Sequence, residues 1–336
     1  MMADPQPILL AGDIGATKTV LALYQGQPHR MLGRRSFRNA DYGDFTALLA
    51  DFFQGDCPRP SAACLGIAGP VAADRVHMTN LNWLIDGAAL AERFGLRQVW
   101  LINDLVATAV GALHLPESDF KVLNPGEAQH GAVRAVLAPG SGLGEAFLVP
   151  QGEGFLPCAS EGGHASFAPR NQEQDALLTF MRGRLGHVSV EQVCSGLAVP
   201  QLFAFMRERW PVPSWLEDEL QGAADATPVI LGAAMKAHRG EVDCEVAAQT
   251  LHLFLDILAD EAANLVLKTL AFGGFYLGGG LSARLQSCLD AQRFMRIFAR
   301  GTYAQRLAQV PIRLILNPEA ALWGAAAHGW QLLGKP

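Results

Sequence analysis

The chain has 336 residues, half of them hydrophobic and 17% charged, and its net charge is −6. This length is sufficient for two domains with large cores, and the acidic balance gives no support for binding to nucleic acid or to an anionic membrane. The start MMADPQP lacks a signal-peptide pattern, no apolar run reaches the ~20 residues that span a bilayer, and the six cysteines include no CxxC pair, so we expect a cytoplasmic protein without structural disulfides.

The first half of the chain predicts a β-hairpin followed by alternating strands and helices. The hairpin covers residues 8–24 and turns at Asp13-Ile14-Gly15-Ala16-Thr17-Lys18. Further strands are expected near 34–39, over 61–72 and over 98–104, and helices over 41–54, 83–96 and 105–115.

The second half repeats this scheme. We expect a hairpin at 135–150, helices over 171–187, 191–209 and 245–271, short strands at 275–280 and 310–317, and a closing helix over 319–333. The segment RERWPVPSW, residues 207–215, predicts a surface loop. Small residues of the closing helix, among them Ala320 and Gly324, suit close packing on a sheet. Hairpins followed by strand–helix alternation indicate mixed sheets with helices on their faces.

Both hairpins place a glycine turn between two apolar runs. Glycines leave backbone N–H groups open to close approach by phosphate oxygens, so the two turns could hold one polyphosphate from opposite sides. The alternative is that they are two ordinary glycine-rich hairpins.

In the first turn, Asp13 stands at the end of an apolar strand, and Thr17 and Lys18 follow. A carboxylate at this place can hold Mg²⁺ through water, and a hydroxyl and an ammonium group suit phosphates. A turn-capping aspartate is the alternative.

The second turn reads Gly140-Ser141-Gly142-Leu143-Gly144, which is GxGxG rather than the dinucleotide fingerprint GxGxxG. Gly278, Gly280 and Ala283 fit GxGxxA, but no Asp or Glu occurs from Ala291 through Pro318, where a nicotinamide site would want one. We therefore reject a nicotinamide site. GxxxxGK[ST], the Walker motif, is also absent.

Polar residues at two further places are candidate ligands. Asn103 and Asp104 end a buried strand, where side chains commonly face a ligand; the alternative is a helix N-cap. Glu161 and His164 flank two glycines and suit hydrogen bonding to a polyhydroxylated ligand, since no second His or Cys stands at metal-ligand spacing. Glu191 alone would be an ordinary acid in the first turn of a helix.

Together these motifs resemble those of bacterial hexokinase-type glucokinases, in the actin-like sugar-kinase superfamily. GDIGATKTVLAL and LAPGSGLGEAFLV are similar to the two phosphate motifs, LNWLI…LINDLVATA to the sugar segment, SEGGHASFAPRN…LGHVSVEQVCSG to the family's loop and helix, and FGGFYLGGGLSARL to the adenosine motif. The match runs from about Ile8 to Gly329 in the expected order.

The resemblance implies a function and a set of roles. It implies transfer of the γ-phosphoryl group of ATP to the 6-hydroxyl of D-glucose, with Mg²⁺, in a homodimer. Asp104 would be the catalytic base and Asp13 would position Mg-ATP. The implied glucose ligands are Asn103, Asp104, Glu161, His164 and Glu191. The implied ATP ligands are Asp13, Gly15, Thr17, Lys18, Gly140, Ser141, Gly142, Gly144, Gly278, Gly279 and Gly280.

The resemblance also implies an α/β fold of two actin-like (ribonuclease H-like) domains with a cleft between them. The small domain would comprise residues 1–114 and 316–336, and the large domain residues 115–315. Two positions depart from the family pattern: Ala16 replaces a glycine of DxGGT, and Ser166 takes the acidic place of VDFAP. If position 16 needs a positive φ, the alanine is strained.

Three alternatives stay open at this point: a kinase of another hexose or an amino sugar, a non-catalytic sugar sensor, and an actin-like ATPase such as a chaperone. A chaperone would not need the sugar residues, and a sensor would not need Asp104. The phosphoryl donor, ATP or polyphosphate, also stays open.

Overall fold

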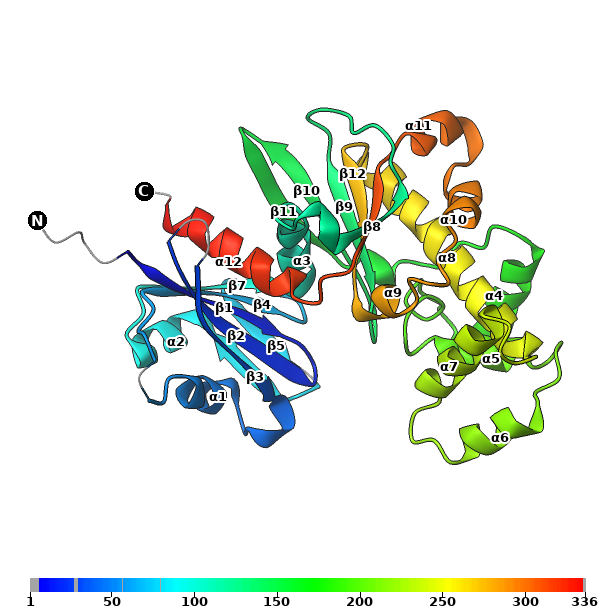
Figure 1. Ribbon diagram of the computed structural model, residues 1–336, viewed down its shortest axis with the longest axis horizontal. Helices are drawn as coiled ribbons and strands as arrows, with labels where there is room; N and C mark the ends of the chain where they lie inside the picture. Colours follow the sequence, from blue (N-terminus) through cyan, green and yellow to red (C-terminus); the bar gives the residue numbers. More distant parts are fainter. Residues whose placement is uncertain (1–5, 27–29, 56, 79, 335–336) are drawn as a thin grey trace, which may run out of the picture. The chain divides into compact units, whose positions relative to one another are not determined.

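The computed structural model describes residues 6–26, 30–55, 57–78 and 80–334 (Figure 1). The chain divides into two compact units. The first contains residues 1–119, 157–159 and 317–336, and the second contains residues 120–156 and 160–316. The last helix of the chain therefore belongs to the same unit as the first strand.

The first unit is built on a five-stranded sheet with the order β3-β2-β1-β4-β7. β1 is antiparallel to β2 and parallel to β4, which is parallel to β7. Its strands are β1 (Ile8–Ile14), β2 (Lys18–Gln25), β3 (Arg30–Arg38), β4 (Ala62–Ile67) and β7 (Gln98–Asn103), with β5 (Arg75–Met78) and β6 (Trp83–Asp86) paired as a separate hairpin. Its helices are η1 (Asn39–Asp41), α1 (Phe45–Phe52), α2 (Gly87–Phe94), α3 (Asp104–Ala112), η2 (Glu117–Asp119) and α12 (Ala320–Leu333).

Helices cover both faces of this sheet (Figure 1). Strand side chains alternate between faces. Leu10 and Ile14 of β1 pack in the cluster that contains Phe45 and Leu48 of α1, whereas Ala11 packs with Leu322 of α12. Asp13 is two residues from Ala11 and so lies on the α12 face.

Two glycines allow α12 to approach α3 closely. A Cβ on Gly324 would overlap the carbonyl oxygen of Ala107, and a Cβ on Gly111 would overlap that of Ala320. One turn further on, a Cβ on Gly329 would lie 2.8 Å from Cβ of Cys64 on β4. The small residues of α12 therefore serve a helix–helix contact as well as the expected contact with the sheet.

The second unit is built on a six-stranded sheet with the order β11-β10-β9-β12-β13-β8. Its strands are β8 (Phe120–Asn124), β9 (Arg134–Pro139), β10 (Leu143–Gln151), β11 (Gly154–Ser160), β12 (Gly274–Leu277) and β13 (Ile312–Ile315). Its helices are η3 (Gly162–His164), α4 (Gln172–Leu185), α5 (Val199–Met206), α6 (Ser214–Gln221), α7 (Ala226–His238), α8 (Glu245–Thr269), α9 (Gly280–Arg284), α10 (Ala291–Phe298), η4 (Gly301–Tyr303) and α11 (Ala304–Ala308).

The two sheets share one topology. In each, the hairpin supplies the central strand and its antiparallel neighbour, and two later strands join the other side of the central strand in parallel. β9, β10, β12 and β13 thus correspond to β1, β2, β4 and β7, with β8 as an added antiparallel edge. The repeated glycine turns are equivalent parts of a duplicated sheet.

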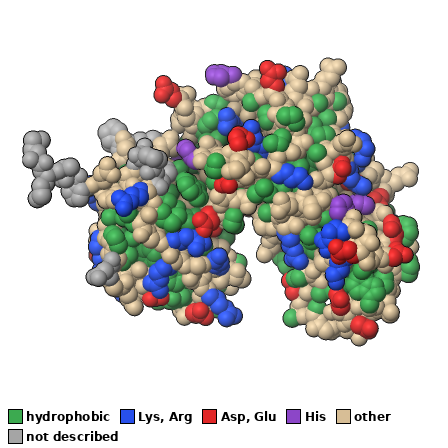
Figure 2. Space-filling model, in the orientation of Figure 1, with side chains coloured by type: hydrophobic (Ala, Val, Ile, Leu, Met, Phe, Trp, Pro, Cys, Tyr) green, Lys and Arg blue, Asp and Glu red, His purple; other side chains and the backbone are tan. Residues whose placement is uncertain are grey.

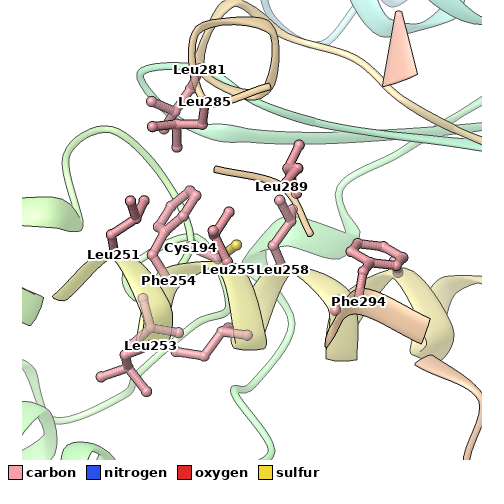
Figure 3. Close-up of a cluster of buried hydrophobic side chains, with 14 of the residues drawn as sticks. Cys194, Leu251, Leu253, Phe254, Leu255, Leu258, Leu281, Leu285, Leu289 and Phe294 are labelled. Carbon is pink, nitrogen blue, oxygen red and sulfur yellow. The ribbon is translucent and has the colours of Figure 1, made fainter. Parts of the chain in front are cut away.

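The core of the second unit surrounds α8, whose 25 residues carry apolar side chains on several faces (Figure 3). In Figure 3, Leu251 and Phe254 point towards Leu281 and Leu285, and Leu253 points to the opposite side of the helix. A helix that is apolar on several faces is a buried one, and α8 lies at the centre of the unit's core.

Most of the predicted elements occur, and three predictions were wrong in part. Residues 83–86 form β6 rather than the start of a helix, and residues 191–198 form turns, so that α5 begins only at Val199. The predicted loop at 207–215 ends where α6 begins at Ser214. β5, β8, β11, α7, α9, α10 and α11 were not predicted.

The surface carries charges of both signs. On the face drawn in Figure 2, Lys and Arg side chains alternate with Asp and Glu side chains over each unit. Among the described residues, the helices are all too short or too polar to cross a membrane.

Candidate functional sites

The first glycine turn, between β1 and β2, is held by a buried asparagine. The Gly15 N–H donates to the carbonyl of Lys18 (3.0 Å). Asn39, 1% exposed, donates from Nδ2 to the Gly15 carbonyl (2.9 Å) and accepts at Oδ1 from the Thr19 hydroxyl (2.8 Å). Ala16 is exposed and is not among the residues with positive φ, so its methyl group causes no backbone strain here.

A pocket of about 300 Å³ opens beside this turn in the first unit. Its lining includes Asp13, Thr17, Lys18, Arg34 and Glu319. Arg34 Nη2 and Glu319 Oε1 form an ion pair at 2.5 Å. Burial raises the pKa of Asp13 to about 6, with Lys18 lowering it and Glu319 raising it further. With Gly15, the pocket therefore joins four of the predicted ATP residues to two charged side chains, Arg34 and Glu319, that the sequence did not point to.

Asp13 makes no hydrogen bond or ion pair with the described residues. A buried carboxylate without a partner is costly, and one that lines a pocket is available to a cation. An oxygen ligand of this kind fits Mg²⁺.

Asn103 and Asp104 meet at the junction of β7 and α3. Asn103 is the N-cap of α3: its Oδ1 accepts from the N–H groups of Leu105 (2.9 Å) and Val106 (3.3 Å), and its Nδ2 donates to the Gly69 carbonyl (3.2 Å). Asp104 is the first residue of the helix and its Oδ1 accepts from the Leu105 N–H (2.9 Å). The cap alternative thus applies to Asn103 rather than to Asp104.

Asp13 and Asp104 lie at the same edge of the first sheet. β1, β4 and β7 are parallel neighbours, and all three end at this edge. Gly66 of β4 lies between the two sites: a Cβ on it would be 3.5 Å from the Gly12 carbonyl oxygen and 3.8 Å from Cα of Asp104. The carboxyl ends of parallel strands are the usual ligand edge of such sheets.

The second glycine turn, between β9 and β10, is tied to the turns before α5. The Gly140 N–H donates to the Gly142 carbonyl (2.8 Å). The N–H groups of Gly196 (2.8 Å) and Leu197 (3.2 Å) donate to the carbonyls of Gly140 and Ser141. A Cβ on Gly196 would lie 2.8 Å from the Gly140 carbonyl oxygen.

Glu191 connects this turn to the segment that carries Glu161 and His164. Its Oε2 accepts from the Leu143 N–H (2.8 Å) and lies where a Cβ on Gly142 would be. Its Oε1 is 3.8 Å from His164 Nδ1, and His164 Nε2 is 3.8 Å from Glu161 Oε2. The structure therefore brings together the three predicted sugar residues of the second unit, beside the second glycine turn.

The two glycines between Glu161 and His164 are required by packing. A Cβ on Gly162 would overlap Glu145 Oε2, and a Cβ on Gly163 would overlap the Leu143 carbonyl oxygen. The Glu191 N–H donates to the Gly163 carbonyl (2.8 Å).

Gly278, Gly279 and Gly280 follow β12 at the end of its neighbour β9. The Gly278 N–H donates to the Leu137 carbonyl (2.9 Å), and Gly279 has a φ of 81° against the carbonyl of Pro139. The predicted adenosine residues thus lie at the strand end that leads into the turn Gly140–Gly144. Ser166, the second departure, forms a hydrogen bond with His187 Nε2 (3.1 Å).

Sequence reasoning missed Asn39, Arg34, Glu319 and Glu145. Asn39 ends the strand predicted near 34–39 and reads as an ordinary polar residue there. Glu145 stands directly after the second glycine turn, where an acid in an otherwise apolar strand, GEAFLV, was a usable signal.

Comparison with solved structures shows the class of the protein. The crystal structure of a glucokinase from an Antarctic psychrotroph superposes with a TM-score of 0.82 at 32% identity, covering 96% of this chain and 98% of that one. A ROK family glucokinase from Streptomyces griseus has the same fold, with a TM-score of 0.64 at 21% identity over 96% and 99% of the two chains. The duplicated sheets and these likenesses define an ATP-dependent hexose kinase of the actin-like fold.

The sequences narrow the class to one family. The family model described as Glucokinase matches residues 10–332. A glucokinase of Nostoc punctiforme is 33% identical over 336 residues, with 95% of this chain and 98% of that relative covered. The chain belongs to the glucokinase family.

Proposed function

We propose that the protein transfers the γ-phosphoryl group of ATP to the 6-hydroxyl of D-glucose, giving glucose 6-phosphate and ADP. The observation that carries the proposal is the family match over residues 10–332, together with the clustering of Glu161, His164 and Glu191 against the second glycine turn.

In this proposal the hydroxyl groups of glucose are bound by five residues: Asn103, Asp104, Glu161, His164 and Glu191. Carboxylates accept hydrogen bonds, and the imidazole does either, which suits hydroxyl groups. Asn103 keeps one amide hydrogen for the sugar, because its Oδ1 and its other amide hydrogen are engaged with the backbone.

In this proposal Asp104 is the general base. It accepts the proton of the 6-hydroxyl as that oxygen attacks the γ-phosphorus in line, while the β- and γ-phosphate charge is stabilised by backbone N–H groups of the two glycine turns. Asn103 supplies the N-cap of α3, so the helix does not require Asp104 for capping.

For ATP we assign Asp13, Gly15, Thr17 and Lys18 in the first unit. In the second unit we assign Gly140, Ser141, Gly142, Gly144 and Gly278–Gly280. Asp13 would hold Mg²⁺ through water, and that ion would neutralise phosphate charge. Lys18 would attract the phosphates from the same pocket.

We further propose that the protein acts in the cytoplasm as a homodimer. Light scattering behind a sizing column tests the dimer, since one chain has a mass of 36.0 kDa.

A coupled assay tests the reaction. We expect ADP release with glucose and Mg-ATP, and much slower release with mannose, fructose, glucosamine or N-acetylmannosamine. Polyphosphate replaces ATP in parallel reactions. Turnover of another hexose at a higher kcat/KM than glucose, or no turnover with any of them, would refute the proposal.

A further inference from the structure

Glu145 of β10 is an acid buried in the second unit. Its residue is 3% exposed, and its Oε1 is buried without a hydrogen-bond partner among the described residues. A buried polar atom without a partner is rare and costs free energy, so its retention calls for a reason. Glu145 is also the residue directly after Gly144, the last glycine of the second glycine turn.

The Glu145 carboxyl group supports the segment that carries Glu161 and His164. Its Oε2 fills the space that a Cβ on Gly162 would occupy. The Gly162 N–H is turned to Ser160 Oγ (3.0 Å), and the Gly163 carbonyl accepts from Glu191. The backbone of this segment is therefore fixed on one side by the Glu191 N–H and on another by the Glu145 carboxyl.

Other titratable groups surround this carboxyl. From α8 come Glu261, itself 4% exposed, and Lys268; from the turns before α5 comes the buried thiol of Cys194. Glu161 and His164 of the supported segment have 65% and 63% of their side-chain surface exposed and are solvated.

The surroundings of Glu145 favour its protonated form. Glu261 has partners for its negative charge, since Asn264 Nδ2 donates to it at 3.0 Å and Lys268 Nζ lies at 3.4 Å. Glu145 has neither. Burial, followed by the nearby Glu261 carboxylate, raises the pKa of Glu145 to about 7, with Lys268 lowering it.

We propose that Glu145 is a positioning residue of the sugar site: as a neutral carboxyl group packed against Gly162, it holds the segment that places Glu161 and His164. The inference rests on the proposed role of those two residues in binding glucose. When Glu145 ionises, burial of its unpaired charge costs free energy, so the side chain moves towards water or a cation. Gly162 then loses its packing contact, and Glu161 and His164 move apart.

The test compares Glu145→Gln and Glu145→Asp with the parent enzyme from pH 5.5 to 9. Glutamine keeps the length and stays neutral, so we expect its glucose KM to match that of the parent at pH 6. The parent's glucose KM should rise about tenfold more than that of Glu145→Gln by pH 8.5. Aspartate is one methylene shorter and withdraws from Gly162, so its glucose KM should rise about tenfold at pH 6, with kcat changed less than about threefold.

A solvent-exposed acid on the turn between β10 and β11, Glu153, supplies the matched control. Glu153→Gln should follow the parent at each pH. If Glu145→Gln also follows the parent, or if Glu145→Asp has the parent's glucose KM, the positioning role is refuted.

Thermal unfolding provides a readout that does not need activity. Because the pKa of Glu145 is about 7 in the folded protein against 4.5 ordinarily, the folded state binds more protons between these values, and the free energy of unfolding falls as pH rises through that window. Glu145→Gln should lack this component and gain stability relative to the parent above pH 7. If the parent fails to bind or phosphorylate glucose while this difference persists, the proposed function is wrong, but the protonation of Glu145 in the folded protein is supported. If the difference is missing in an active enzyme, Glu145 is not protonated in the folded protein and the proposal is refuted.

Discussion

Asn103 and Asp104 are neighbours in the chain, and only Asn103 caps α3. The Oδ1 of Asn103 accepts from the N–H groups of Leu105 and Val106, and Asp104 is the first helical residue. Helix capping and the proposed base role can therefore be tested by separate substitutions of Asn103 and Asp104.

Asp104→Asn should lower kcat at least about a hundredfold, because general-base catalysis contributes roughly 10²–10⁴ in rate and an amide accepts no proton. The amide oxygen still accepts hydrogen bonds, so glucose binding should weaken much less and the melting temperature should stay nearly unchanged. Steady-state kinetics, equilibrium glucose binding and thermal unfolding on one preparation check this.

The matched control is Asp225→Asn, which changes the N-cap of α7, where the carboxylate accepts from the Thr227 N–H at 2.9 Å. Asparagine caps helices about as well as aspartate, so this variant should keep the parent's rate and stability. Turnover by Asp104→Asn within a few-fold of the parent would show that Asp104 is not the base.

Asn39→Ala should loosen the first glycine turn, which we propose binds phosphate. It leaves the Gly15 carbonyl and the buried Thr19 hydroxyl without their partner, at a cost of about 1–3 kcal/mol in the free energy of unfolding. We expect the KM for ATP to rise several-fold while the KM for glucose changes little.

Asn171→Ala is the comparison for Asn39→Ala. Asn171 is exposed and caps α4 through the Gln174 N–H (2.9 Å), so its loss should lower stability by about 1 kcal/mol and leave the KM for ATP unchanged. An equal rise in both Michaelis constants for Asn39→Ala would contradict a local effect on the first glycine turn.

Ala16→Gly tests the departure from the DxGGT pattern. Ala16 lacks a positive φ, so glycine relieves no strain and only adds freedom to the unfolded chain, at a cost of about 0.4–1 kcal/mol. Removing the methyl group widens the turn, so the KM for ATP should stay the same or fall. A clear rise in that constant, with the glucose KM constant, would show that the alanine assists nucleotide binding.

Gly324→Ala should destabilise the protein by about 1–3 kcal/mol, because the added methyl group would overlap the Ala107 carbonyl of α3. Gly232→Ala on α7 is the matched change, since no atom lies within 4 Å of its added Cβ. It should stabilise the protein by up to about 1 kcal/mol. Thermal unfolding of the two variants should therefore shift in opposite directions, and a common direction would argue against the close helix contact.

The sequence predicted those parts of the fold that local pattern controls. The two hairpins, the long α8 and the cap at Asn103 follow from alternation, helical periodicity and capping preference. The turns at 191–198 did not, because Val190, Val193 and Leu197 recur at helical spacing. There the N–H groups of Gly196 and Leu197 donate to carbonyls of the second glycine turn instead of to a helix. Tertiary contacts of this kind are not visible in a local window.

Buried side chains that support a site without lining it could not be predicted from the sequence, for the same reason. Asn39 supports Gly15 and Glu145 supports Gly162, and each is separated in sequence from the residue that it supports. Each also resembles an ordinary polar residue of a strand or loop. Their burial depends on α8 and on the β1–β2 turn, which only the folded chain brings to them.

The membership of α12 in the first unit has a consequence during synthesis. Residues 6–119 contain all strands of the first sheet, but the α12 face of β1 and β4 stays uncovered until residues 320–333 are made. The intervening 200 residues take a ribosome roughly 10–40 s at about 5–20 residues per second. Throughout that interval the nascent chain presents an apolar sheet face, so the second unit, although later in sequence, can complete its fold first. Newly made chains should accordingly depend on holding chaperones that bind the amino-terminal third, and a circular permutant that begins with α12 should shorten that dependence.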